Sequence, residues 1–255
     1  MAYGVNHGYP PGLKIIELES CQSTNSYLKE NYGHVKFQWP VLVTAKHQTG
    51  GRGRDQRVWF SPEGKGLYSS FGFELPRVDT LHLLPLVAGI AIIQTLMKLT
   101  GLTFDLKWPN DVLYKGKKIA GILIENSIGD GHAFCVVGMG INLNQMVSDF
   151  PGELVNRAVS LKMIAAEAYS FKDINPLLAT LFWEWLDKLQ NNAHHLIIQT
   201  VNRYSGYFME QPISFHQPPG ERVVKGIFKG INADGGLILG NSDGSLTIYY
   251  AGEIR

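Results

Sequence analysis

Up to residue 206, the apolar positions of the chain fall into two kinds of pattern. Short apolar runs such as Val41-Leu42-Val43 are typical of buried strands, and the longer apolar stretch 83–99 is typical of a core helix. Because both kinds are mixed along the chain, the pattern predicts an α+β fold. The expected strands are 14–18, 40–45, 67–73, 104–108, 112–114, 119–124 and 134–137. Two helices are expected over 83–99 and 161–168. Three more are expected: one capped at 23–25, one that opens at Asn175-Pro176, and one that ends near Tyr204.

The pattern changes after Gly206. Four short strand-like runs follow one another, and turn residues at Asp234-Gly235-Gly236 and Asp243-Gly244 separate the later ones. Closely spaced short strands of this kind predict a small antiparallel barrel. We therefore expect two domains, residues 1–206 and residues 207–255. The four runs are 212–215, 223–231, 237–239 and 246–250.

The composition excludes several classes of protein. The 255 residues carry 23 Lys and Arg against 22 Asp and Glu, a formal net charge of +1, which argues against a dedicated nucleic-acid-binding domain. Two cysteines that lie far apart, Cys21 and Cys135, exclude a disulfide scaffold and indicate either a reducing compartment or simply inert thiols. The stretch 83–93 is shorter than the ~20 residues of a membrane span, and residues 1–13 do not resemble a signal peptide. We expect a cytoplasmic protein with no membrane partner.

A segment rich in glycine and arginine, 49–57, is the most unusual part of the chain. From Lys46 to Lys65 there are five basic and two acidic residues, a local net charge of +3. Exposed backbone N–H groups beside guanidinium groups suit a phosphate or a carboxylate. The alternative is a solvated basic loop or a short RNA-binding tract, although Trp59 gives the segment an apolar anchor. The segment is not a Walker loop, because the sequence has no GxxxxGK[ST].

A second group of polar residues follows the expected strand 104–108. Asp111 suits Mg²⁺, which prefers one or two carboxylates together with phosphate oxygens, and Lys107 suits the charge of a phosphate. The alternative is a turn with a surface ion pair. Lys118 directly precedes the apolar run 119–124, so we expect its side chain to point into a site.

Glycines mark two further candidate positions. Gly121 lies within an expected strand, where glycine weakens the strand unless another group approaches closely, so we expect a ligand to pack there. Gly138 and Gly140 precede Asn142, whose amide suits either the edge of an adenine or the capping of a turn. His194-His195 lie in a helical stretch without matching acidic or Cys partners, so we expect no metal site built from His or Cys.

These segments, in this order, resemble the biotin protein ligase family. The motifs that carry the resemblance are Ser23-Thr24-Asn25, Gln48 with Gly51-Arg52-Gly53-Arg54, Trp59-x-Ser61-Pro62, Lys107-Trp108-Pro109-Asn110-Asp111, Lys118 with 121–125, and Gly138-x-Gly140-Ile141-Asn142. The resemblance spans essentially the whole chain, including 224–227 and 251–254. It implies a central mixed or antiparallel sheet with helices, as in class II synthetases, followed by a small C-terminal SH3-like β-barrel.

The resemblance also implies a reaction in two steps. Biotin's carboxylate attacks the α-phosphorus of ATP, which gives biotinyl-5′-AMP and pyrophosphate. A lysine of a biotin carboxyl carrier protein then attacks the mixed anhydride and releases AMP. Mg²⁺ is the expected cofactor, with Asp111 as its ligand. Because a mixed anhydride hydrolyses readily, the site has to exclude water, which a loop that orders over the ligand would do.

The resemblance assigns roles to individual positions. Lys118, Arg52 and Arg54 are the expected catalytic residues, with Lys118 as the main electrostatic catalyst. The residues expected to bind biotin are Ser23, Thr24, Asn25, Gln48, Gly51, Arg52, Gly53, Lys118 and Gly121. Those expected to bind ATP or the adenylate are Arg52, Arg54, Trp59, Lys107, Asn110, Asp111, Lys118 and Asn142.

The chain departs from the family pattern in two places. Gln56 stands where members commonly have glycine, which would cost ~1 kcal/mol or more if the position needs a positive φ. Few residues precede Lys14, so we expect a monofunctional enzyme without the N-terminal DNA-binding domain of bifunctional relatives, and no DNA partner. The resemblance is compatible with a homodimer.

Two other functions compete with this interpretation. A lipoate or octanoate ligase would share the catalytic fold, but that group resembles the GRGR and KWPND segments poorly. A nucleic-acid-binding module would use the Arg-Gly segment and the barrel. Residues 207–255, however, hold four basic against five acidic residues, which is the wrong charge for a polyanion.

Overall fold

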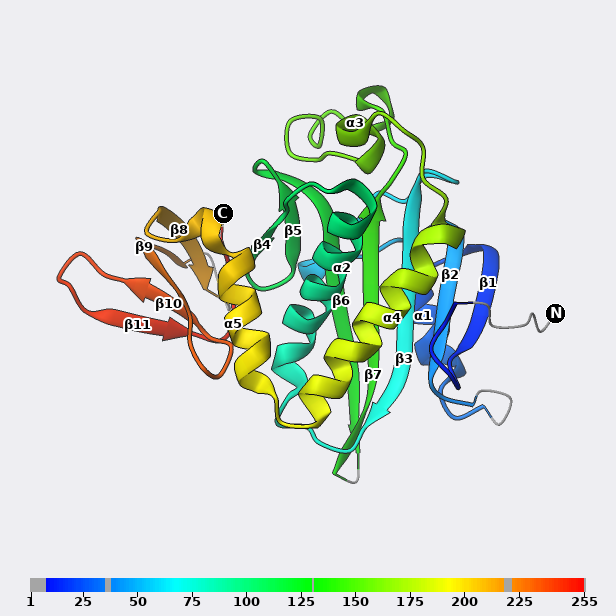
Figure 1. Ribbon diagram of the computed structural model, residues 1–255, viewed down its shortest axis with the longest axis horizontal. Helices are drawn as coiled ribbons and strands as arrows, with labels where there is room; N and C mark the ends of the chain where they lie inside the picture. Colours follow the sequence, from blue (N-terminus) through cyan, green and yellow to red (C-terminus); the bar gives the residue numbers. More distant parts are fainter. Residues whose placement is uncertain (1–7, 35–37, 130, 218–221, 255) are drawn as a thin grey trace.

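A seven-stranded mixed sheet forms the centre of the protein (Figure 1). The computed structural model describes residues 8–34, 38–129, 131–217 and 222–254. The strand order is β1-β2-β3-β7-β6-β5-β4, in which β1 and β2 are parallel and every other neighbouring pair is antiparallel. The strands are β1 (Lys14–Cys21), β2 (Val41–Gln48), β3 (Gly66–Leu75), β4 (Asp105–Lys107), β5 (Asp111–Tyr114), β6 (Lys117–Gly129) and β7 (His132–Asn142).

The C-terminal part of the chain forms a second, five-stranded antiparallel sheet beside β4 (Figure 1). The four predicted strands are present, and the structure adds a short fifth, β12, which pairs with β8. The expected fold class, a mixed sheet with helices followed by a small all-β domain, is therefore confirmed. The strands are β8 (Pro212–Gln217), β9 (Arg222–Ile231), β10 (Leu237–Gly240), β11 (Leu246–Tyr249) and β12 (Glu253–Ile254).

The middle strands of the central sheet are buried on both faces, as β2 and β3 show, whereas the edge strand β1 has no fully buried residue. In β2, Leu42 packs into the large core, whereas Val41 and Val43 pack on the opposite face with Leu28 of α1. In Figure 1, α2, α4 and α5 cover one face of the sheet and α1 lies behind it. The helices are α1 (Thr24–Asn31), α2 (Leu84–Thr100), α3 (Leu161–Ala165), α4 (Phe171–Gln190) and α5 (His194–Tyr204).

The predicted core helix is α2, which with the turn before it runs from Leu81 to Thr100. By length and composition alone this stretch could cross a membrane, since it has 20 residues and a mean hydropathy of 1.7. The expectation that it is too short was therefore wrong. Its most apolar window is 67% buried within the protein, because α2 packs both against the sheet and against α4, which lies beside it on the same face (Figure 1). Residues 1–7, part of the segment judged for a signal peptide, lie outside the described residues.

Two predicted helix boundaries were wrong. The helix expected to open at Asn175-Pro176 begins at Phe171, because the Ser170 hydroxyl accepts a hydrogen bond from the backbone N–H of Lys172 and caps the helix there. Pro176 thus lies inside α4, and Asn175 is buried and donates to Thr44 Oγ1 at 2.8 Å. The other error is α3, which ends at Ala165 rather than at residue 168.

The Gly138-x-Gly140 segment is part of a strand and not a turn. β7 was expected to end at residue 137 but continues to Asn142. Gly140 pairs with Tyr68 of β3 on one side and with Gly121 of β6 on the other. Ladder hydrogen bonds from both neighbours hold these glycines in an extended conformation, which the local sequence could not reveal.

The two sheets are joined through the side chain of Trp108. Its indole is 3% exposed and donates from Nε1 to the backbone carbonyl of Gly235 at 3.0 Å. Gly235 has φ 81°, and a Cβ there would lie 2.5 Å from Leu83 Cδ2, so the turn has to carry a glycine to fit against α2. Ser205 Oγ adds a hydrogen bond to the carbonyl of Leu106 at 3.0 Å. The C-terminal sheet is thus attached next to the KWPND segment.

Replacing Trp108 by Phe tests this attachment. Phe keeps the ring but leaves the buried carbonyl of Gly235 without its donor, so we expect the free energy of unfolding to fall by ~1–3 kcal/mol. Urea denaturation measures the change. Trp183→Phe is the matched control, because the described residues offer no acceptor to that indole. Equal losses for both variants would contradict the proposed attachment.

Candidate active site

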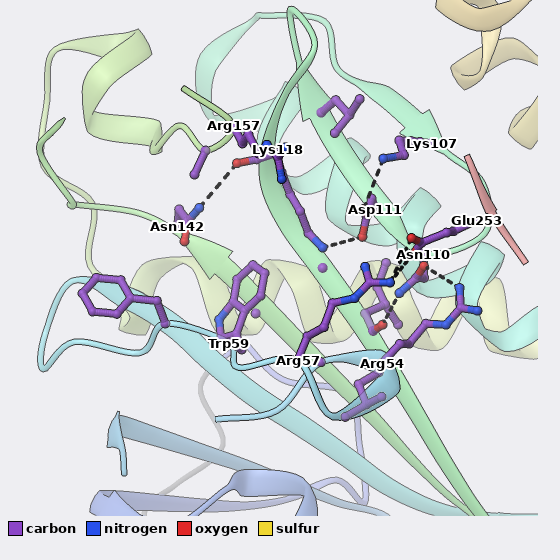
Figure 2. Close-up of a pocket in the computed structure, with 18 of the residues that line it drawn as sticks. Arg54, Arg57, Trp59, Lys107, Asn110, Asp111, Lys118, Asn142, Arg157 and Glu253 are labelled. Carbon is purple, nitrogen blue, oxygen red and sulfur yellow. Dashed lines mark hydrogen bonds and ion pairs between the residues drawn. The ribbon is translucent and has the colours of Figure 1, made fainter. Parts of the chain in front are cut away.

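One cavity of about 1290 Å³ opens where β6, β7, the Gly-Arg segment and β12 meet (Figure 2). Pockets for single small ligands commonly measure about 300–1,000 Å³, so the volume suits two substrates together. The cavity brings together every site residue predicted from the sequence except Gly51. The predicted residues that line it are Ser23, Thr24, Asn25, Gln48, Arg52, Gly53, Arg54, Trp59, Lys107, Asn110, Asp111, Lys118, Gly121 and Asn142.

Gly51 supports the loop instead of lining the cavity. A Cβ at this position would lie 2.5 Å from both Ser61 Oγ and the carbonyl oxygen of Trp59. The backbone N–H of Trp59 donates to the Gly51 carbonyl at 2.9 Å. A side chain at Gly51 would therefore push apart the two ends of the Gly-Arg loop.

One end of the cavity is lined by neutral polar groups from the first turn of α1. Ser23 occupies the N-cap position, but its hydroxyl makes no capping hydrogen bond, unlike the predicted cap. The backbone N–H of Thr24 donates to Gln48 Oε1 at 2.9 Å. Asn25 Oδ1 accepts from Ser70 Oγ at 2.6 Å and lies so close to Gly138 that a Cβ there would collide with it. The end of the cavity is thus polar, nearly buried and narrow.

The Gly-Arg loop forms a tight, closed turn over the cavity. Gly53 N–H donates to the Arg57 carbonyl at 2.7 Å, and Arg52 pairs with Val58 in an antiparallel bridge. At the tip, Asp55 and Gln56 have φ of 53° and 60°. The position of Gln56 therefore does require a positive φ, a conformation that costs a non-glycine residue ~1 kcal/mol. The loop nevertheless keeps the basic character expected of it.

Trp59 lies on a floor made by two glycines. Gly121 and Gly140 face each other across β6 and β7. A Cβ at Gly140 would lie 2.5 Å from the Trp59 indole, and a Cβ at Gly121 would lie 3.0 Å from both the indole and Lys118 Cε. The close approach expected at Gly121 therefore comes from Trp59 and Lys118. The indole N–H of Trp59 is buried and has no hydrogen-bond partner in the described structure.

The cationic end of the cavity is organised by Asp111. Lys118 Nζ lies 2.6 Å from Asp111 Oδ1, and Lys107 Nζ lies 3.9 Å from Asp111 Oδ2. The predicted Lys107–Asp111 ion pair thus exists, but both side chains are largely buried in the cavity wall and not on an open surface. Burial lowers the pKa of Lys107, Asp111 acts against that shift, and the neighbouring charge of Lys118 adds to it.

Two arginines of the loop contact the C-terminal segment, Arg57 at β12 and Arg54 at the residue before it. Arg54 Nη1 donates to Asn110 Oδ1 at 3.2 Å and to the carbonyl of Gly252 at 3.1 Å. Arg57 Nη2 lies 2.8 Å from Glu253 Oε2. Figure 2 shows Arg54, Arg57 and Glu253 converging on the same side of Asp111. Sequence reasoning missed Arg57 and Glu253, although Arg57 stands in the Gly-Arg segment 49–57 and Glu253 in the segment 251–254 of the resemblance.

Asn142 holds the segment that follows β7. Its Nδ2 donates to the carbonyl of Val159 at 3.1 Å, and its Oδ1 accepts from Gln145 at 3.1 Å. The backbone N–H of Lys118 donates to the carbonyl of Arg157 at 2.7 Å. Asn142 thereby positions the chain around Lys118, while its adenine contact stays a prediction. Arg157 also lines the cavity and was not predicted.

Positive charge dominates the cavity wall. Among the described residues that line it, six are basic and two are acidic, Asp111 and Glu253. Because like charges in a partly desolvated space repel one another, such a wall favours an anionic ligand. The six basic residues are Arg52, Arg54, Arg57, Lys107, Lys118 and Arg157.

Asp111 has no further acidic side chain, His or Cys grouped with it among the described residues to complete a metal site made by the protein alone. No group of three or more His, Cys, Asp or Glu side chains suited to a metal occurs in the part of the chain that the structure describes. Asp111 is already in contact with two lysines. Mg²⁺ bound through Asp111 therefore stays a prediction that rests on the resemblance.

Gly140→Ala tests the glycine floor. The added Cβ would collide with the Trp59 indole, so we expect the loop 51–59 to lose its closed position and exchange its amide hydrogens faster. Gly129→Ala is the control, because a Cβ there meets nothing within 4 Å. Hydrogen exchange read by mass spectrometry measures the effect, and unchanged exchange in Gly140→Ala would contradict the packing described.

Comparison with known proteins agrees with this geometry. The chain matches the Biotin/lipoate A/B protein ligase family over residues 17–142 and the Biotin protein ligase C terminal domain over residues 209–255. It is 43% identical over 130 residues to the Bifunctional ligase/repressor BirA of Bacillus subtilis, an alignment that covers 50% of this chain and only 40% of that protein. It is 31% identical over 251 residues to the BirA of Escherichia coli, covering 97% of this chain and 75% of that protein.

A solved structure has the same architecture. The biotin protein ligase from Aquifex aeolicus, in complex with biotin and ATP, superposes with a TM-score of 0.79 at 28% sequence identity, covering 95% of this chain and 97% of that one. The likeness includes both the mixed sheet and the C-terminal β domain. The chain therefore belongs to the biotin protein ligase family.

Proposed function

We propose that this chain uses ATP to attach biotin to a lysine of a biotin carboxyl carrier protein, through biotinyl-5′-AMP. The observation that carries the proposal is one cavity with a narrow neutral polar end and a strongly cationic end. An acyl-adenylate has this character, because a ring, a carboxyl group and a phosphate follow one another along it. The E. coli and Aquifex relatives, which span most of this chain, support the same reaction.

The neutral end supports biotin over an apolar acid. The ureido ring of biotin carries two N–H donors and one carbonyl acceptor. Asn25 Oδ1 has a second lone pair to accept from such a donor, and the Ser23 hydroxyl makes no capping bond in the protein. Ser23, Thr24 and Asn25 are each less than 5% exposed. Lipoate would bring an apolar ring to these groups and leave them without new partners, which costs binding energy.

In the activation step, an oxygen of the biotin carboxylate forms a bond to the α-phosphorus of ATP. The bond from that phosphorus to the bridging oxygen breaks, and pyrophosphate leaves with its electron pair. Lys118 keeps N–H groups beyond the one that faces Asp111, so it can donate to the anion that forms between carboxylate and phosphate. Asp111 holds the ammonium group in place, so little reorganisation is needed during the reaction.

In the transfer step, the amine of the carrier lysine attacks the acyl carbon. The new C–N bond replaces the C–O bond to the phosphate, the amine loses a proton, and AMP leaves. Arg54 and Arg57 connect the loop to β12, so the closed loop separates the adenylate from water until the carrier arrives. Residues 1–206 and 207–255 would thus act together as a catalytic and a covering domain.

Other parts of the proposal rest on the family alone. These are a homodimer and the use of Mg²⁺. The match to the biotin protein ligase family over both parts of the chain supports the carrier protein as the macromolecular substrate. Each stays a prediction for this chain.

ATP–pyrophosphate exchange tests the proposed function directly. The purified chain is assayed with biotin, with lipoate, with octanoate and without an acid. We expect exchange to depend on biotin and to be weak with the other two acids. Exchange that is fastest with lipoate or octanoate would favour the rival ligase, and no acid-dependent exchange at all would contradict both.

Lys118→Ala tests the catalytic assignment. Removal of a charge-assisted contact to the adenylate is expected to lower biotin-dependent exchange by about 10- to 100-fold, which corresponds to ~1.5–3 kcal/mol. Lys115→Ala is the control, because Lys115 is exposed at the tip of the β5–β6 hairpin. If both variants kept the activity of the unaltered chain, Lys118 would have no part in the mechanism.

A further inference from the structure

Glu125, at the end of the polar part of the cavity, connects two groups that the mechanism uses. Its carboxylate is 17% exposed and accepts hydrogen bonds from Asn25 Nδ2 at 2.9 Å and from Arg52 Nη2 at 3.1 Å. Lys29 Nζ lies 2.8 Å from its other oxygen. Glu125 does not itself line the cavity, yet it contacts one residue of the polar end and one residue of the loop.

The contact with Glu125 determines how the Asn25 amide is oriented. Nδ2 donates to Glu125 and to the carbonyl of Leu123 at 3.2 Å, so both amide hydrogens are used. Oδ1 is left to face Ser70 Oγ, which donates to it at 2.6 Å. A flipped amide would place Oδ1 against a carboxylate and a carbonyl, where three acceptors would repel one another. The acceptor of Asn25 is therefore held toward the cavity side.

A series of further hydrogen bonds leads from Asn25 across the polar end of the cavity to Trp59, at the other end of the loop. Ser70 donates to Asn25, so across the 2.6 Å contact with Ser70 Oγ the Thr24 hydroxyl is the donor, and it shares this one hydrogen with Gln48 Oε1 at 3.2 Å. Gln48 accepts from the Thr24 N–H and donates from Nε2 to Ser61 Oγ at 3.1 Å, and Ser61 donates to the Trp59 carbonyl at 3.0 Å. The chain of contacts starts at Arg52 and returns to Trp59.

We propose that Glu125 is a positioning residue that ties the Gly-Arg loop to the ring-binding end of the cavity. Its carboxylate holds Arg52 in the closed loop and fixes the acceptor of Asn25 for the incoming ring. This inference rests on the proposed function for the identity of the ring, a cyclic urea. The tether between Glu125 and Arg52 does not depend on that identity.

A carboxylate at this position is suited to the role. Burial would raise the pKa of Glu125, but hydrogen bonds from Lys29 and Asn25 and the charge of Arg52 outweigh burial and hold the pKa below its usual range. Glu125 therefore stays ionised at neutral pH. A neutral amide would still accept from Asn25, but it would also turn an N–H group toward Lys29 or Arg52.

The test compares Glu125→Ala and Glu125→Gln with the unaltered chain. In the first measurement, without any ligand, we expect amide hydrogens of 51–59 to exchange faster in both variants, because Arg52 has lost its charged partner. In the second, biotin-dependent ATP–pyrophosphate exchange, we expect the KM for biotin to rise about tenfold or more in Glu125→Ala, with a smaller rise in Glu125→Gln. Because Arg52 is also expected to contact the adenylate, the kcat and the KM for ATP should change as well, but by less than the KM for biotin.

Glu19→Gln is the matched control. Glu19 pairs with Lys46 on the exposed edge strand β1, and its side chain is 81% exposed. Unchanged amide hydrogen exchange of residues 51–59 in both Glu125 variants would overturn the proposal whatever the ligand is. Equal rises in the KM for biotin and for ATP would mean a general structural effect and would also overturn it. If the unaltered chain shows no biotin-dependent ATP–pyrophosphate exchange, the proposed function fails. The ligand-free hydrogen-exchange measurement then decides alone whether Glu125 holds Arg52 in the closed loop.

Discussion

The central constraint on this structure is the repulsion among six basic side chains that share one partly buried cavity. Two ions of the same sign close together in a medium of low polarity are costly, and the fold supplies counter-charges where the crowding is greatest. Asp111 lies between Lys107 and Lys118, Glu253 faces Arg57, and Glu125 faces Arg52. Positive charge is still in excess, so an anionic ligand would relieve repulsion that the protein itself does not fully balance.

This constraint accounts for the position of the C-terminal sheet. Glu253 of β12 and the carbonyl of Gly252 just before it contact arginines of the loop, so the C-terminal sheet supplies part of the counter-charge and covers the site. Trp108 attaches that sheet next to Asp111. The KWPND segment therefore serves two purposes: its tryptophan joins the two sheets, and its carboxylate and amide organise the cations.

Much of the site could be predicted from the sequence, because its motifs are local. Ser23-Thr24-Asn25, Arg52, Arg54 and Lys118 carry chemistry that their neighbours reveal. What could not be predicted depends on contacts between distant segments. The continuation of β7 through Gly140 needs β3 and β6 on either side. Glu253 has a role only through its contact with Arg57, in a loop about two hundred residues earlier in the chain. Glu125 is a functional candidate only because Asn25 and Arg52 both donate hydrogen bonds to its carboxylate. The helix start at Phe171 was misjudged for a local reason, since Asn175-Pro176 looked like a better cap than Ser170.

The central claim is that excess positive charge around Lys118 recognises the anion of an acyl-adenylate. Calorimetric titration with two stable analogues tests it most directly: biotin joined to adenosine by a linker that carries one negative charge, and by a neutral linker of the same length. The account predicts tighter binding of the charged analogue, with most of that preference lost in Lys118→Ala. Equal affinity for the two analogues, or a preference that survives in Lys118→Ala, would contradict it.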